Sequence, residues 1–240
     1  SDQDQFGSSV AVFGKYLVVG AEGEDDWGSN SGSVYVYDLS SGTPSTPIAS
    51  LHNPTPGFAD YFGRKVSISD TFVIVGAEGV SSSATEEGAA YVFRLDSFAT
   101  TPVVLSNPTP AFGDHFGNSV AVSGEFMIVG ANSDDTGAND SGSVYIFDSS
   151  GILKSTRINP SPTAHDQFGV SVAAWGKYAL VGGLYEDTRG LDQGAVYVIE
   201  IANASLGVAL NGGDLTITDN KGDNNQLNVR VVNSGANLEI

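Results

Sequence analysis

The sequence predicts an all-β protein in which four-stranded antiparallel sheets repeat as the blades of a β-propeller. The dipeptide Phe-Gly recurs four times, at spacings of 56, 54 and 52 residues. Each copy continues with two short apolar runs, a polar loop and a run centred on Tyr, and no apolar pattern of helical period appears. A repeat of this length indicates an array of supersecondary units. The four copies are Phe6-Gly7, Phe62-Gly63, Phe116-Gly117 and Phe168-Gly169.

The first repeat shows the four strands expected in every unit. Residues 9–13 and 16–20 predict a hairpin that is closed by a turn of two residues. A polar loop then leads to a third strand at residues 33–37, which are rich in β-branched and aromatic side chains. Residues 48–51 predict a fourth, outer strand, because the prolines just beyond them suit an edge or a loop.

Two spacings are constant in all four repeats. The glycine of Phe-Gly is followed after 13 residues by a second glycine, and after 12 more by a third. Constant lengths predict a constant backbone, and glycines at fixed offsets predict positive φ angles or close backbone approach. All variation in length falls between the third strand and the next Phe-Gly, so that segment is expected at the tolerant rim. The second and third glycines are Gly20, Gly76, Gly130 and Gly182, and Gly32, Gly88, Gly142 and Gly194.

The pattern Phe-Gly-x-Ser-Val-Ala-Val, then Val-Val-Gly-Ala, then Ser-Gly-Ser-Val-Tyr-Val-Tyr, resembles the FG-GAP repeat. That repeat builds the seven-bladed propeller of integrin α subunits and many bacterial extracellular proteins. The resemblance implies a four-bladed propeller over residues 1–211 and a secreted or cell-surface protein. A C-terminal β-hairpin, or the start of a further β module, is expected over residues 212–240 because apolar residues alternate there. The expected blades are residues 6–61, 62–115, 116–167 and 168–211.

The chain departs from the integrin pattern in the turn between the first and second strands. In integrins this turn is often a calcium loop of spaced Asp and Asn residues. Here each turn has two residues, which is too short to wrap a calcium ion with its six to eight oxygen ligands. The usual metal site of the family is therefore not transferred, and the chain is similar to the short-turn bacterial type.

Charge and composition exclude some classes of partner. The net charge of −18 argues against nucleic-acid binding, because phosphate contacts need clustered Lys and Arg. No apolar run is long enough to cross a membrane as a helix. The chain has no cysteine, so it forms no disulfide.

A candidate metal site lies in the loops between the second and third strands. Strand connections in a meander alternate between two faces, so these loops share one face with the links into the next Phe-Gly. Three of the loops carry two adjacent acidic residues and an oxygen ligand five or six residues on, which suits Ca²⁺. The alternative is that Asp, Asn, Ser and Gly simply form good turns. The candidate ligands are Glu24, Asp25 and Asn30; Asp134, Asp135 and Asp140; and Glu186, Asp187 and Asp192.

Other positions have expected roles in binding or packing. Trp27, with Asp25, Asp135 and Asp187, is the candidate contact for a protein or carbohydrate ligand, since exposed aromatic rings stack on sugars or anchor partners. The aspartates that precede each Phe-Gly are expected to accept backbone N–H bonds. The Phe rings and Trp175 are expected to pack between blades.

The function predicted from these observations is a non-catalytic binding or adhesion module, assisted by Ca²⁺ at the loop face. No catalytic motif is recognised in the sequence. Two alternatives stay open. One is a structural subunit of a fibre or cell envelope, which would associate with itself. The other is an enzyme on a propeller scaffold, a hydrolase or lyase, which would be favoured by polar residues from several blades converging on the central channel.

Overall fold

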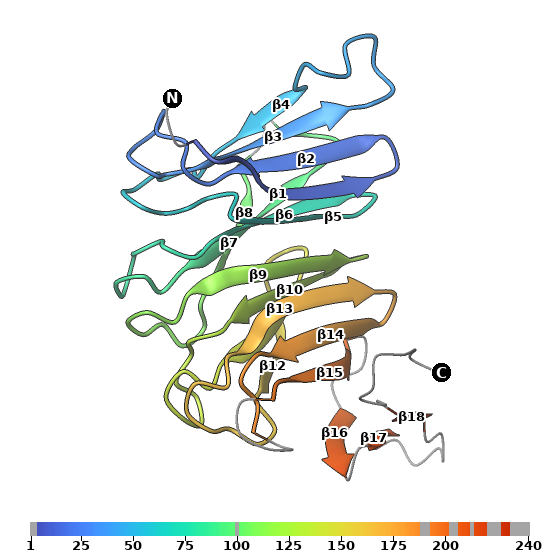
Figure 1. Ribbon diagram of the computed structural model, residues 1–240. Coiled ribbons are helices and arrows are strands. Elements are labelled where there is room, and N and C mark those ends of the chain that lie inside the picture. The colour runs from blue at the N-terminus through green and yellow to red at the C-terminus, as the bar shows by residue number, and fades with distance from the viewer. Residues whose placement is uncertain are drawn as a thin grey trace.

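The computed structural model describes residues 4–98, 101–187 and 193–201, and the backbone of three further strands within residues 206–230. The described residues are strands and turns, and they contain no helix that is long and apolar enough to cross a membrane. The first three repeats each form an antiparallel sheet of four strands in chain order (Figure 1). Their strands are β1 (Phe6–Phe13), β2 (Tyr16–Ala21), β3 (Ser33–Asp38) and β4 (Ala49–Leu51); β5 (Lys65–Ile68), β6 (Phe72–Ala77), β7 (Ala89–Arg94) and β8 (Val103–Ser106); and β9 (Phe116–Ser123), β10 (Phe126–Ala131), β11 (Ser143–Asp148) and β12 (Leu153–Ile158).

The fourth repeat differs from the expected blade at its outer edge. Its sheet contains β13 (Phe168–Trp175), β14 (Tyr178–Gly183) and β15 (Ala195–Glu200). The next strand, β16 (Leu206–Asn211), was expected as the fourth strand of this blade, but it pairs with β17 (Asp214–Asp219). Only two residues separate β16 from β17, so the short connection favours a local hairpin. The expected boundary at residue 211 therefore falls inside that hairpin.

The C-terminal strands form a sheet of their own. The expected pairing of two alternating apolar runs is confirmed, because β17 pairs with β18 (Leu227–Arg230) in the register Leu215↔Val229 and Ile217↔Leu227. The rest of residues 212–240 lies outside the described part of the chain.

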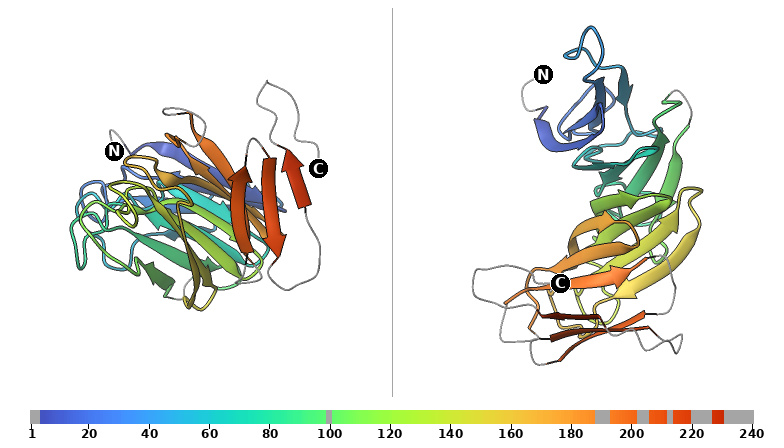
Figure 2. Two further views of the ribbon diagram at one scale, coloured as in Figure 1. Left: turned by 90° about the horizontal axis from the view of Figure 1, so that it is seen from below. Right: turned by 90° about the vertical axis from the view of Figure 1, so that its right-hand side faces the viewer.

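The four repeat sheets follow one another along an open arc, with the first blade at one end and the fourth at the other (Figure 2). They have the strand order of propeller blades, and the array does not close within the described residues. The first strands of neighbouring blades lie side by side along the inside of the arc. In the second to fourth repeats this ordering places the Phe-Gly dipeptide, which begins β9 and β13 and comes just before β5, next to the preceding blade.

The core consists of three apolar layers, one between each pair of neighbouring blades. Phe62 is completely buried among Val18 and Val34 of the first blade and Val75 and Tyr91 of its own. Phe116 and Phe168 occupy the same position in the second and third layers. The expected packing of these rings between blades is confirmed. Each ring also contacts the central Tyr of its own third strand, with centroids 5.4, 5.6 and 5.2 Å apart.

The constant spacing of the glycines has a steric cause. A Cβ on Gly20, Gly76 or Gly130 would lie closer than 3.0 Å to the carbonyl oxygen of the Phe-Gly glycine in the next blade. A Cβ on the third glycine of each of these repeats would meet the backbone of the next Phe residue in the same way. The predicted close approach is therefore confirmed, since both glycines face the Phe-Gly peptide of the next blade.

Hydrogen bonds seat each Phe-Gly peptide on the preceding blade. The N–H groups of Phe62, Phe116 and Phe168 donate to backbone carbonyls at the end of the preceding polar loop, at 3.1, 3.0 and 2.9 Å. The Ser9 hydroxyl donates to the Gly63 carbonyl at 2.6 Å, and the Ser119 hydroxyl donates to the Gly169 carbonyl at 2.6 Å. Each blade is thus positioned by its own first two residues.

Length varies in only one segment of the repeat. Nine residues separate Asn53, Asn107 and Asn159 from the Phe-Gly that comes after each of them. The third strand and the fourth strand pair as Val34↔Leu51, Ala90↔Leu105 and Val144↔Arg157. The interval between these paired residues shortens by two from each repeat to the next.

We expect Gly130→Ala to lower the free energy of unfolding by about 3 kcal/mol, because the added methyl group has no space between two backbones. Urea denaturation measures the change. Gly42→Ala is the control, since a Cβ there meets nothing within 4 Å and the residue has no positive φ. Equal denaturation midpoints for the two variants would contradict the steric role of Gly130.

Candidate functional site

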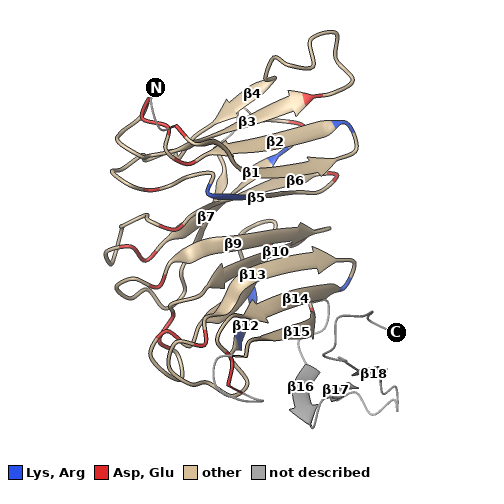
Figure 3. Ribbon diagram, viewed as in Figure 1, with Lys and Arg blue, Asp and Glu red and all other residues tan. Residues whose placement is uncertain are grey.

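The loop face of the molecule is formed by the loops between second and third strands and by the links into each Phe-Gly. Figure 3 shows most Asp and Glu residues on this face, to the left of the sheets, with basic residues at the start of β5. The face contains the predicted site residues of the first, third and fourth loops. It also contains a cavity and several exposed aromatic rings that sequence reasoning did not identify.

Buried aspartates fix the links. Asp60, Asp114 and Asp166 are almost completely buried, and each accepts a hydrogen bond from an Asn side chain seven residues earlier at 2.7 Å. Each also accepts a backbone N–H bond from three residues earlier, at 2.6 to 2.7 Å. The predicted structural role of these aspartates is confirmed. The same bonds explain why each link opens with Asn-Pro. The Asn and Asp side chains bind each other across the link, and we call this pair the clamp.

The first and third acidic loops have the same internal bonding. Glu24 accepts a hydrogen bond from the Tyr35 hydroxyl at 3.1 Å, and Asp134 accepts one from the Tyr145 hydroxyl. Asp25 accepts from the backbone N–H of Asn30 at 2.7 Å, and Asp135 accepts from that of Asp140 at 2.8 Å. Asn30 and Asp140 have φ angles of 52° and 50°, which Asn and Asp tolerate best among residues with a Cβ.

The second loop reaches a similar shape with a different residue. Val80 stands where the other loops have their first carboxylate, and Glu87 supplies one from the other end of the loop. Its carboxylate accepts hydrogen bonds from Ser82, Ser83 and the Ala84 N–H. Burial raises the pKa of Glu87, but these bonds outweigh it and lower the pKa to about 2.

The fourth loop contains a carboxylate without partners. Glu186 is completely buried, and neither of its oxygens has a hydrogen-bond partner among the described residues. The hydroxyl of Tyr197, its neighbour, also has none. Burial raises the pKa of Glu186 to about 7 and the nearby Asp166 carboxylate adds to the rise, while the adjacent Tyr197 hydroxyl and the Asn159 side chain oppose it. A buried group of this kind is uncommon outside functional sites.

The predicted metal ligands are not gathered into one cluster. In the described part of the chain, no three His, Asp or Glu side chains come together in an arrangement that could hold a metal ion. The acidic residues of the first and third loops already accept hydrogen bonds from their own loop or from the strand that follows it. Asp192 lies outside the described residues. Ca²⁺ binding therefore stays a prediction, with Glu186 the carboxylate that has the most unused bonding capacity.

Large aromatic rings are exposed on the loop face, among them Trp27, Phe58, Phe112 and Tyr185. Trp27 is 53% exposed and stacks on His52, with ring centroids 4.2 Å apart and 12° between the planes. Phe58 and Phe112 lie in the first and second links and are even more exposed. Sequence reasoning identified Trp27 alone, although the two Phe residues share a position, two residues before the clamp aspartate.

A cavity of about 310 Å³ lies where three blades meet at the start of their first strands. Sequence reasoning missed it because its residues come from three blades, and most of them lie at the positions directly after Phe-Gly or Gly-Ala. Arg64 forms ion pairs with Glu78 at 2.9 Å and with Glu22 of the first blade at 3.1 Å. The lining residues are Arg64, Lys65, Glu78, His115, Asn118, Asn132 and Val170.

Two buried polar atoms at the cavity have no partner among the described residues. They are Nδ1 of His115 and Oδ1 of Asn118. Burial raises the pKa of Glu78, while Arg64 opposes the rise. The cavity thus offers positive and negative charge together with unused hydrogen-bonding atoms, a combination that suits a polar ligand.

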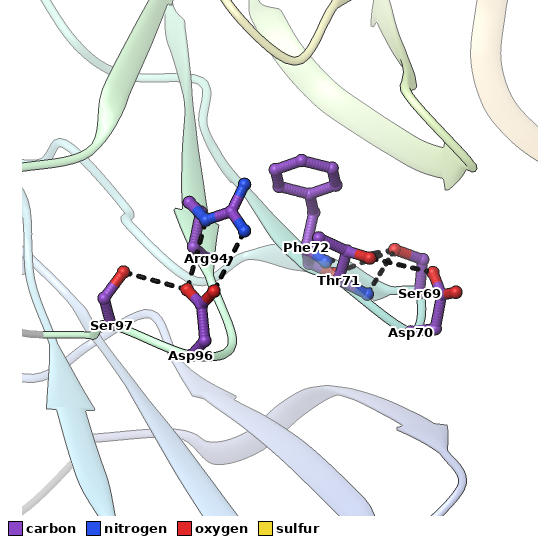
Figure 4. A network of polar contacts seen from close by, with 7 residues as sticks. All are labelled: Ser69, Asp70, Thr71, Phe72, Arg94, Asp96 and Ser97. Atoms are coloured by element: carbon purple, nitrogen blue, oxygen red, sulfur yellow. Dashed lines mark hydrogen bonds and ion pairs between the residues drawn. The ribbon is translucent and has the colours of Figure 1, made fainter.

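The opposite face carries short turns and no comparable feature in the described residues. Figure 4 shows two of its polar contacts. Arg94 binds Asp96 through two nitrogens at 3.1 and 2.9 Å. The Ser69 hydroxyl accepts from the N–H groups of Thr71 and Phe72, which stabilises the one hairpin turn that lacks glycine. Trp175 lies at this end of β13 and is 82% exposed, so its expected packing between blades is wrong.

Comparison with known proteins identifies the repeat. The model of the FG-GAP repeat family matches residues 1–37, 49–93, 105–147 and 160–199. No curated protein matches the sequence. A solved structure described as a crystal structure of the eukaryotic initiation factor is similar over 68% of this chain and 35% of its own length, with a TM-score of 0.40 and 10% identity. That likeness is too distant to support a statement about function.

We expect Glu186→Gln to remove part of the pH dependence of stability. A folded-state pKa of about 7, raised from 4.5, means that the wild type loses stability as pH rises between these two values. The melting temperature of Glu186→Gln relative to wild type should therefore increase by several degrees from pH 4.5 to pH 8. Thermal melts in EDTA measure this, with the exposed Glu125→Gln as control. A constant difference across pH would contradict the burial of an ionisable Glu186.

Proposed function

Because the chain belongs to the FG-GAP repeat family, we propose that it is a non-catalytic binding module, secreted or at the cell surface, whose loop face meets a protein or carbohydrate ligand. The observation that carries the proposal is the cavity on this face. Residues of three blades line it, and two of them, His115 and Asn118, each have a buried polar atom without a partner among the described residues. An unsatisfied buried polar group is costly, and a ligand group that bonds to it recovers that cost.

The exposed aromatic rings support the same proposal. Trp27, Phe58 and Phe112 lie on the face that contains the cavity, and large exposed rings on a polar surface favour contact with sugar faces or apolar side chains. The acidic loops around them favour basic or hydroxyl-rich ligands over anionic ones. The ligand class that fits is therefore a polar group flanked by a surface on which rings can stack.

An enzyme is the second candidate, and one observation favours it. Polar residues from several blades do converge on the cavity, and His115 and Glu78 are groups that transfer protons in hydrolases and lyases. Two observations weigh against this role. Arg64 binds the Glu78 carboxylate, and among the described residues none bonds to the Nδ1 atom of His115 to orient its ring.

We expect Asn118→Ala to weaken ligand binding about tenfold, since it removes one hydrogen bond to the ligand. Its Oδ1 atom has no partner among the described residues, and its Nδ2 atom donates only a long bond of 3.5 Å to the Val170 carbonyl, so we expect the fold to tolerate the change. Surface plasmon resonance with immobilised protein is run against fibronectin, gelatin, mucin, and cello- and chito-oligosaccharides. Trp27→Ala should weaken the same binding, and Lys177→Ala on the opposite face is the control.

Two outcomes would overturn the binding proposal. One is that no member of the panel binds, or that Asn118→Ala binds as tightly as wild type. The other is turnover: the saccharides are also assayed for new reducing ends, and a rate that His115→Gln abolishes would favour the enzyme instead.

We expect millimolar Ca²⁺ to raise the melting temperature relative to EDTA, because an ion that binds only the native state stabilises it. The Glu186 carboxylate, buried and without partners, is the proposed centre of the site. The increase should disappear in Glu186→Gln and persist in Glu24→Gln, whose parent carboxylate already binds Tyr35. Identical melts with Ca²⁺ and with EDTA would exclude assistance by calcium.

A further inference from the structure

The first two joints between blades are filled by the same side chains. In each, the Phe-Gly ring lies in one apolar layer with a leucine from the fourth strand of the preceding blade and a Phe from the third strand of its own blade. The leucines, Leu51 and Leu105, are buried. The two Phe rings meet edge to face, with centroids 6.1 Å apart in the first joint and 6.0 Å apart in the second.

The third joint departs from this pattern at both positions. Arg157 pairs with Val144 of the third strand, so it occupies the position of the two buried leucines. Ile199 occupies the position of the two third-strand Phe residues. Val144 and Ile199 are both buried in the layer of Phe168. A leucine is thus replaced by a cation, and an aromatic ring by a smaller side chain.

A pocket of about 210 Å³ lies at the third joint. It is formed where β12 ends and the link into the fourth repeat begins, and it shares no residue with the cavity at the first strands. Both replaced positions line it. Its lining comprises residues 156–158 and Pro160 of the third repeat and its link, and Phe168, Tyr197 and Ile199 of the fourth blade.

The Arg157 guanidinium has no ionic partner among the described residues, although the chain has 28 acidic residues. Its Nη1 atom donates to the Thr156 carbonyl at 3.3 Å, and its Nε atom is buried without a partner. An arginine that only covers apolar surface keeps its charged head in water. Here burial lowers the pKa of Arg157. A buried donor without an acceptor is costly, and an acceptor on a ligand recovers that cost.

We propose that this pocket binds a small aromatic acid, whose carboxylate pairs with Arg157 and whose ring packs against Phe168 and Ile199. A guanidinium binds a carboxylate through two parallel N–H bonds, which gives both strength and orientation. An apolar cavity of about 150 Å³ is large enough to hold benzene, so this pocket suits a ring that carries one acidic group. The charge of Glu186 acts on the Tyr197 hydroxyl, which favours the ligand carboxylate at the Arg157 end.

The inference goes beyond the proposed function, because it concerns a different pocket and a different class of ligand. Isothermal titration calorimetry of the full chain with phenylacetate and with benzoate tests it, in about 0.15 M NaCl. We expect one site with a dissociation constant of about 0.1 to 1 mM, which is ordinary for a ligand of this size. Phenylacetamide has the same shape and no charge, so it should bind at least about tenfold more weakly.

Two variants restore the side chains of the other joints. Arg157→Leu removes the cation, and Ile199→Phe fills the pocket with a ring. Each should weaken binding at least about tenfold, with little change in the melting temperature, because both residue types already fit these positions elsewhere in the chain. Lys154→Leu is the matched control, since it removes a positive charge from the same strand and does not line the pocket. It should bind as wild type does.

Four outcomes would overturn the proposal. They are the absence of saturable heat with either acid up to about 10 mM, equal affinity for phenylacetate and phenylacetamide, wild-type affinity in either pocket variant, and equal losses in Lys154→Leu and Arg157→Leu. The last would show that binding follows the net charge of the chain and not the Arg157 guanidinium. Circular dichroism melts of each variant confirm that a loss of binding is not a loss of fold.

Discussion

The structure depends on a close contact between backbones. In each of the three internal joints, two glycines of one blade leave space for the Phe-Gly peptide of the next, and hydrogen bonds and a buried ring hold that peptide in place. The contact fixes the distance and angle between blades. The loop face and the cavity both result from it, because each is a consequence of how the blades are stacked.

Most of the fold was predictable from the sequence because this contact leaves a local signature. The spacings of 13 and 12 residues are visible along the chain, and they reflect the two places where a glycine faces the next Phe-Gly. The outer edge of the fourth blade was predicted wrongly. There the apolar alternation at residues 206–211 fits either neighbour, and the pairing with residues 214–219 is settled by the very short connection. The exposure of Trp175 was also missed, although Phe13 at the same position of the first blade is exposed as well, so this end of the first strand lies outside the packed layer.

The candidate site was much less predictable than the fold. The loop carboxylates were found, since acidic pairs at matched offsets are conspicuous, but most of them bond within their own loop. The cavity was missed because its lining comes from three blades and its residues differ in type, as Arg64, His115 and Asn118 do, so no single repeat displays a motif. Sites on a repeat array arise where the repeats depart from one another, and such departures carry no pattern along the sequence.

The connection between third and fourth strands has a consequence for how this array tolerates change. The interval between the paired residues of these strands shortens by two from repeat to repeat, while the nine residues before each Phe-Gly keep a constant length. Leu51, Leu105 and Arg157, which pair with the third strand, each lie two residues before the Asn that opens the next link. The hydrogen bonds of that Asn therefore set which face of the fourth strand points inward, as they do for the buried Leu51 and Leu105. The connection can gain or lose residues without turning the strand over, because the strand is positioned from its far end.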